Sequence, residues 1–203
     1  MHAIVDHIQS VDLNAGEEAR RYLDTLTKPP GSLGALEELA IQLSAITGEL
    51  KPSVTPPAVV VFAADHGVAA EGVSAFPQAV TAQMVANFAN GGAAINVFAR
   101  QIGAQVEIVD VGVASPLTLP GVTSAKVRHG TANMVLEDAM QCDQAIAAID
   151  VGIAAVNRAK RAGAKCIMVG EMGIANTTAS SAMLAVLTGE SVASVVGAGT
   201  GIN

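Results

Sequence analysis

A glycine turn followed by amide and hydroxyl side chains is the segment of this 203-residue sequence best suited to chemistry. It reads Val169-Gly-Glu-Met-Gly-Ile-Ala-Asn-Thr-Thr178, a pattern that predicts a strand, a turn at Gly173 and a helix beginning at Asn176. The N–H groups at a helix N-terminus attract anions, and threonine hydroxyls add further donors. This combination suits a sugar phosphate, with Glu171 available to ribose hydroxyls. A simple helix cap at Asn176 or Thr177 is the alternative interpretation.

Polar residues or glycines also follow the other predicted strands. The four strand ends are Asp65-His66-Gly67, Asp110 with Gly112, Glu171 with Gly173, and Gly197 to Gly201. Because ligands of open parallel sheets bind outside the carboxyl ends of the strands, we expect these ends to meet at one rim. Gly197-Ala-Gly-Thr-Gly201 is a second candidate for phosphate contact, although it matches neither the dinucleotide-binding nor the P-loop pattern. An ordinary glycine turn there, and a structural role for His66, are the alternatives.

Strands that alternate with helices must position these residues. Buried strands are predicted at 58–64, 105–112, 165–170 and 192–197, and helices at about 78–88, at a segment ending near 102, at 137–162 and at 176–188. This alternation predicts an α/β fold with a parallel, Rossmann-like sheet and helices on both of its faces. Apolar residues at helical spacing predict two further helices within the first 50 residues, which we assign to a smaller domain.

The domain organisation follows from these elements. We expect an N-terminal helical segment with a proline-rich linker at 1–57 and an α/β core domain at 58–203. The glycine loop after the predicted strand at 192–197 normally leads into a helix that covers the sheet. We therefore expect the core domain to be truncated at its C-terminal end.

Composition limits the function classes. Hydrophobic residues make up 51% of the sequence and charged residues 14%, which excludes intrinsic disorder. The net charge of −7 argues against nucleic acid as a partner, because phosphate backbones require a basic face. No apolar run approaches the roughly 20 residues that cross a bilayer, so we expect no membrane contact and a cytoplasmic location. Cys142 and Cys166 lack zinc-site spacing, and no metal site is predicted.

Several segments, taken in order, resemble one enzyme family. They are Lys28-Pro-Pro-Gly-Ser-Leu-Gly34, Ala64-Asp-His-Gly-Val68 with Gln83-Met-Val85, Gly91-Gly-Ala-Ala-Ile-Asn96, Gly130-Thr-Ala-Asn-Met134, Gly170-Glu-Met-Gly-Ile174 with Asn176-Thr-Thr178, and Gly197-Ala-Gly-Thr-Gly201. From about residue 5 to its last residue, the sequence resembles the nicotinate-nucleotide–dimethylbenzimidazole phosphoribosyltransferases. Members of this family are longer, so the sequence would be the N-terminal part of one.

The resemblance implies a reaction and its partners. The phosphoribosyl group of nicotinate mononucleotide would pass to 5,6-dimethylbenzimidazole, giving α-ribazole 5′-phosphate and nicotinate with inversion at the anomeric carbon. This pentosyl transfer belongs to the assembly of the cobalamin nucleotide loop. The resemblance further implies a homodimer that needs no metal and no cofactor. The alternatives are an inactive N-terminal fragment that only binds nucleotide or folds as a module, and a different α/β enzyme acting on a sugar phosphate.

The resemblance also assigns roles to residues. The set that would line the benzimidazole pocket is Ser74, Phe76, Pro77, Gln83 and Met84. The set that would bind the nucleotide is Glu171, Met172, Gly173, Ile174, Asn176, Thr177, Thr178, Gly199 and Gly201. The family's general base is a glutamate expected beyond Asn203, so no catalytic residue is assigned within the sequence. Asp138 and Ala175 depart from the family pattern, which commonly has proline and glycine there.

Overall fold

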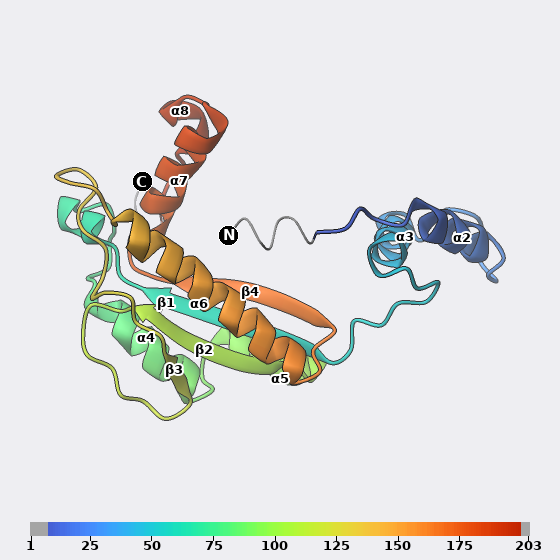
Figure 1. Cartoon of the computed structure of the whole chain (residues 1–203), viewed down its shortest axis with the longest axis horizontal. Coiled ribbons are helices and arrows are strands. Elements are labelled where there is room, and N and C mark those ends of the chain that lie inside the picture. Colours follow the sequence, from blue (N-terminus) through green and yellow to red (C-terminus); the bar gives the residue numbers. More distant parts are fainter. Residues whose placement is uncertain (1–7, 200–203) are drawn as a thin grey trace. The chain divides into compact units, whose positions relative to one another are not determined.

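The computed structural model describes residues 8–199, which belong to two compact units that divide between Val54 and Thr55 (Figure 1). The division falls in the proline-rich stretch that follows the second helix. The correspondence of the two units to domains of the whole protein stays a prediction. Among residues 8–199, no helix is long and apolar enough to cross a membrane.

The N-terminal unit is a pair of helices, as the apolar spacing predicted. Helix α2 (Leu13–Asp24) begins where the Asp12 carboxylate accepts a hydrogen bond from the backbone N–H of Ala15 at 3.0 Å. Helix α3 (Ala35–Thr47) ends at Gly48, whose φ of +70° suits a residue without a side chain. A side chain at Gly16 of α2 would meet the Ala45 methyl of α3 at 3.3 Å, so the two helices pack closely.

The second unit is built on a parallel sheet. Its strands are β1 (Pro57–Ala64), β2 (Gln105–Gly112), β3 (Val122–Ser124) and β4 (Cys166–Met172), in the order β3-β2-β1-β4. Strand β1 pairs in parallel with both β2 and β4, with Val61 opposite Ile108 on one side and Gly170 on the other. β1 is therefore the central strand, and its apolar run is buried because both of its edges and both of its faces are occupied.

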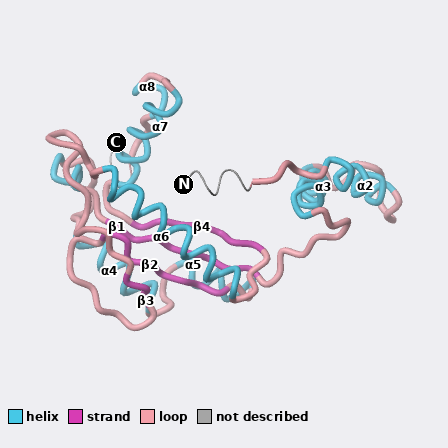
Figure 2. The backbone as a smooth tube through the Cα atoms, in the orientation of Figure 1, coloured by secondary structure: helices cyan, strands magenta, loops and turns pink. Residues whose placement is uncertain are grey.

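Helices cover both faces of this sheet, as predicted (Figures 1 and 2). On one face, Val61 of β1 packs with Phe88 of α4 (Ala79–Ala89) and with Ala99 of α5 (Ala94–Ile102). On the other face, Val60 packs with Ala155 of α6 (Cys142–Arg161). Neighbouring residues of one strand thus serve two separate clusters, because side chains alternate between the faces of a strand.

The prediction of a strand at 192–197 is wrong. After helix α7 (Asn176–Thr188), the chain forms a short helix α8 (Val192–Val195) instead. Val192 is 67% exposed and Val196 is 54% exposed. This segment therefore lacks the burial on both faces that is typical of an inner parallel strand. The fourth strand of the described sheet is β3, which the sequence did not predict.

Two other boundaries differ from the prediction. The helix expected at 137–162 begins later, at Cys142. The strand expected at 165–170 continues to Met172, so that Glu171 lies within β4 rather than in the loop after it. A short 3-10 helix, η1 (Gly67–Glu71), follows β1.

The core on the α4 and α5 face gives a stability prediction. Phe88 is 8% exposed and contributes to that core, whereas Phe98 on α5 is 62% exposed. We expect Phe88→Ala to lower the free energy of unfolding of the α/β unit by about 3 kcal/mol, because it leaves a cavity. The matched variant Phe98→Ala should cost less than about 1 kcal/mol in the same urea titration. Equal losses in the two variants would contradict this description of the core.

Candidate functional site

The order of the strands locates a crevice at the sheet edge. The chain runs from β1 to β2 and β3 on one side, and then returns to place β4 on the other side of β1. The strand order therefore reverses between β1 and β4, and open α/β sheets bind ligands at the carboxyl ends of the strands at such a point. The segments that flank it here are the loop after β1 (residues 65–78) and the turn from β4 into α7 (residues 173–175).

The turn from β4 into α7 lies directly against the end of β1. Gly173 is buried, and a Cβ atom there would collide with the Ala64 carbonyl oxygen and lie 2.9 Å from His66 Nε2. Only glycine allows the turn to lie this close to β1, because Cβ atoms in proteins essentially never come within 3.0 Å of a non-bonded heavy atom. The backbone N–H of Ile174 donates to the buried hydroxyl of Thr81 at 3.1 Å, which ties the turn to α4. The turn is thus fixed from two sides.

The last residue of the turn is strained. Ala175 has a φ of +72°, a left-handed conformation that glycine adopts more easily than alanine. This is the position at which the family resemblance led us to expect glycine. Ala175 also occupies the cap position of α7, so the simple interpretation of Asn176 or Thr177 as the helix cap is wrong.

The first residue of α7 holds Glu171. Asn176 Nδ2 donates to Glu171 Oε1 at 2.5 Å, and Asn176 Oδ1 accepts from the backbone N–H of Thr177 at 2.7 Å. Glu171 is exposed, one residue before the end of β4. The side chain of Asn176 therefore links the carboxylate to the N-terminus of the helix.

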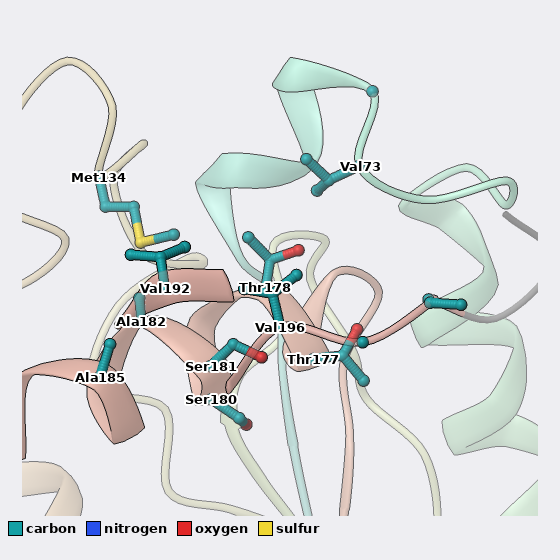
Figure 3. A pocket seen from close by; sticks show the side chains of 14 residues that line it. Val73, Met134, Thr177, Thr178, Ser180, Ser181, Ala182, Ala185, Val192 and Val196 are labelled. Carbon is teal, nitrogen blue, oxygen red and sulfur yellow. The ribbon is translucent and has the colours of Figure 1, made fainter. Parts of the chain in front are cut away.

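A cavity of about 670 Å³ lies beside the first turns of α7 (Figure 3). Thr177, Thr178 and Ser181 contribute hydroxyl groups to its lining, and Val73 and Met134 contribute apolar side chains. Gly199 also lines this cavity, while Gly201, the other predicted glycine, lies outside the described residues. Helix α8 contributes Val192, so part of the lining comes from the segment that was predicted as a strand.

A smaller cavity of about 210 Å³ brings the two predicted groups of residues together. Ser74 and Phe76 from the predicted base-binding group face Met172, Gly173, Ile174, Asn176 and Thr177 from the predicted nucleotide-binding group. The ring of Phe76 is 50% exposed and can cover a planar ligand. Phe76 and Ser74 also line a second cavity of about 600 Å³, together with Pro77.

Two predicted base-binding residues lie elsewhere. Gln83 and Met84 are on α4, where the side chain of Gln83 is exposed and that of Met84 packs against the core. Neither of them lines the cavities described above.

Of the four predicted strand ends, three meet at the rim. Asp65 donates its backbone N–H to the Gly112 carbonyl oxygen at 2.9 Å, and Gly173 lies against Ala64. Asp110, however, is 1% exposed and forms an ion pair with Lys126, with Oδ2 3.0 Å from Nζ. It therefore stabilises the strand end and is not available to a ligand. The segment from Gly197 follows a helix rather than a strand.

Thr81 and His66 are functional candidates whose signal in the sequence is weak. Thr81 is fully buried on the inner face of α4, a position typical of a core residue. His66 lines a further cavity, of about 360 Å³, together with Glu171 and Asn176. Burial lowers the pKa of His66, and the charges of Glu171 and Asp65 oppose this shift.

In the part of the chain that the structure describes, no group of three His, Cys, Asp or Glu residues could hold a metal ion.

Comparisons with known proteins agree with one another. A family model described as a phosphoribosyltransferase matches residues 8–203. A curated nicotinate-nucleotide–dimethylbenzimidazole phosphoribosyltransferase of Chloroflexus aggregans is 56% identical over 200 residues, which are 98% of this chain and 57% of the relative. The corresponding protein of Halalkalibacterium halodurans is 53% identical, over 98% of this chain and 56% of its own length.

A solved structure agrees with the curated relatives. The crystal structure of CobT from Thermus thermophilus superposes with a TM-score of 0.90 at 50% identity, over 94% of this chain and 57% of that one. The chain therefore spans between half and two thirds of the length of the proteins that it matches.

The close approach at Gly173 generates a prediction about this turn. We expect Gly173→Ala to lower the free energy of unfolding by about 2 kcal/mol or more, because the new methyl group collides with the end of β1. Gly170→Ala is the matched control, since a Cβ atom there meets only Val61 Cγ2 at 4.0 Å. Thermal unfolding of the two variants compares them, and a Gly173→Ala protein as stable as Gly170→Ala would contradict the packing of the turn.

Proposed function

Because the chain belongs to the nicotinate-nucleotide–dimethylbenzimidazole phosphoribosyltransferase family, we propose that its protein transfers the phosphoribosyl group of nicotinate mononucleotide to 5,6-dimethylbenzimidazole. The bond between C1′ and the nicotinate nitrogen breaks while an azole nitrogen forms a new bond to C1′ from the opposite face. The configuration at C1′ inverts, the azole N–H loses its proton to a base, and the products are α-ribazole 5′-phosphate and nicotinate. This reaction contributes to the cobalamin nucleotide loop.

The observation that carries the proposal is the cavity of about 210 Å³ between the loop after β1 and the turn into α7. Ser74 and Phe76 come from one side of it, and Gly173, Asn176 and Thr177 come from the other. A transfer between two planar bases requires both to lie close to one ribose, on opposite faces. Two groups of residues assigned to different substrates thus line one shared space.

The N-terminus of α7 supports binding of the 5′-phosphate. The helix has 13 residues, so its N-terminal end carries a partial positive charge, and Thr177 and Thr178 add hydroxyl donors. We assign the phosphate to the cavity of about 670 Å³ that these residues line, with Gly199 also in its lining. Gly201, which we keep in the proposed site, lies outside the described residues.

Glu171 supports the sugar chemistry. Its carboxylate is held by Asn176, is exposed, and lines the cavity of about 360 Å³ next to the turn. We assign to it hydrogen bonds from the ribose hydroxyls and stabilisation of the positive charge that develops on the ribose as the glycosidic bond breaks. Met172, Gly173 and Ile174 form the adjoining wall of the cavity.

Ser74, Phe76 and Pro77 are the proposed direct contacts to the benzimidazole. The backbone N–H of Phe76 donates to Ser74 Oγ at 3.2 Å, which holds the loop in a tight turn. Gln83 and Met84 stay in the proposed base-binding group because of the family resemblance, although they lie on α4 outside the cavity.

A nucleotide-binding module without catalysis is the second candidate for these 203 residues. Apart from Glu171, which would also stabilise the developing charge on the ribose, every residue assigned above binds or orients substrate, and we assign none of them as the general base. This distribution of roles favours the second candidate for the chain by itself. It predicts binding of nicotinate mononucleotide without release of nicotinate.

A homodimer and a cytoplasmic location belong to the same proposal. Leu36, Leu39 and Ile46 follow one side of α3 by their spacing and are 64%, 53% and 66% exposed, which supports coverage by a second copy. The proposed substrate is a charged nucleotide, and a charged group does not enter the interior of a bilayer without a large cost in free energy.

Chromatographic detection of nicotinate tests the reaction. The purified chain is incubated with nicotinate mononucleotide, with and without dimethylbenzimidazole. Release that depends on dimethylbenzimidazole is the result expected for the transferase. Binding without release assigns the chain to the second candidate, and release of nicotinate that does not depend on the azole would contradict the proposed transfer.

The phosphate assignment gives a second test. We expect Thr177→Val to weaken binding of nicotinate mononucleotide by about threefold to tenfold in calorimetric titration, because one hydrogen-bond donor is lost without a change in shape. Thr188→Val is the matched control at the other end of α7, where the hydroxyl donates to the Leu184 carbonyl oxygen at 2.7 Å. Equal affinities for the Thr177→Val variant and its control would remove Thr177 from the site.

A further inference from the structure

His66 lies under the turn that carries the proposed nucleotide-binding residues. It follows β1, and its ring is so close to Gly173 that a Cβ atom on that residue would lie 2.9 Å from Nε2 and 3.0 Å from Cδ2. The ring therefore packs directly against the turn from β4 into α7. A displacement of the ring would move the backbone between Met172 and Ile174.

His66 is also the neighbour of Glu171. The register of the sheet sets Phe62 of β1 opposite Glu171 of β4, so the ends of these two strands bring the imidazole and the carboxylate to the same edge. Both side chains line the cavity of about 360 Å³, and Asn176, which is bonded to Glu171 Oε1, lines it too. Three polar groups therefore converge at one edge of a cavity whose other walls include Phe62 and Met183.

The surroundings of the ring determine its charge. Burial lowers the pKa of His66 from its ordinary value, and this effect exceeds the attraction of the Glu171 and Asp65 carboxylates. Asp65 precedes His66 in the same loop, and its Oδ2 already accepts a hydrogen bond from the backbone N–H of Ala114 at 2.7 Å. Burial therefore favours the neutral form of the imidazole.

We propose that His66 is a positioning residue for the phosphoribosyl transfer: its ring supports the turn at Gly173 and lines the same cavity as the Glu171 carboxylate, which it leaves available to the ribose. This inference rests on the proposed function, which needs that carboxylate beside the ribose. A lysine or arginine in the place of His66 would pair with Glu171 and cancel its charge. A neutral ring fills the same space and leaves the negative charge available to the developing positive charge of the ribose.

Protonation of His66 reverses this arrangement. An imidazolium would form an ion pair with Glu171 and compete with the substrate for the carboxylate. Affinity for nicotinate mononucleotide should therefore fall as the pH is lowered through the titration of His66. The phosphate of the nucleotide titrates in a similar range, but its effect is the same in every variant of the protein.

The test is the titration of His66 observed by nuclear magnetic resonance of the full chain. His66→Phe identifies the His66 signal among the four histidines of the sequence and retains a ring beneath Gly173. In the unsubstituted chain, we expect a midpoint below the ordinary value for histidine. Glu171→Gln should lower this midpoint further, by roughly half a unit, because it removes the carboxylate charge that favours the imidazolium. A midpoint that does not change in Glu171→Gln would overturn the proposal.

Binding of nicotinate mononucleotide supplies the second readout. Between neutral and acidic pH, the unsubstituted chain should lose about threefold more affinity than His66→Phe, whose ring cannot be protonated. Equal losses would show that His66 has only a structural role and would overturn the proposal. If the nucleotide does not bind at any pH while Glu171→Gln still shifts the His66 midpoint, the coupling stands and the proposed function fails.

Discussion

The contact of Gly173 with the end of β1 is the constraint on which the candidate site depends. A side chain at this position would collide with the Ala64 carbonyl oxygen and with His66, so the turn into α7 can follow the strand end only through glycine. The hydrogen bond from Ile174 to Thr81 fixes the same turn from the α4 side. With the turn held in this way, the end of β4 at Met172 and the first residues of α7 face the loop that carries Ser74 and Phe76. The geometry of the site is therefore set by backbone packing at the sheet edge.

Much of the fold was predictable because its signals are local. The buried run in β1, the run in β2 and the helix that begins at Asn176 have the bounds expected from apolar patterning, within one residue. The short strand β3 was not predictable, since three residues carry no periodicity and pair only because Ile108 and its neighbours are present. The segment from Val192 to Val195 has the composition of a strand, but no strand of the described residues lies beside it, and it forms a helix.

The site could be predicted in part for a similar reason. Residues at strand ends, such as Glu171 and Gly173, can be located once the strands are assigned, because parallel strands end at the same edge. Contacts between distant segments have no such signature. Thr81 has the pattern of a core residue of α4, and its bond to Ile174 spans 93 positions of the sequence. The position of Met84, on a core-facing part of α4 rather than in a cavity, likewise depends on how the helix rotates against the sheet.

Binding of a phosphorylated ribose between the N-terminus of α7 and the loop after β1 is central to the proposed function. The most direct measurement is a titration of the isotope-labelled chain with nicotinate mononucleotide, followed through the magnetic resonance signals of the backbone amides. We expect the largest shifts at residues 171–178 and in the loop at 73–77. Largest shifts in the N-terminal helical unit, or around Asp110 and Lys126, would contradict this binding mode.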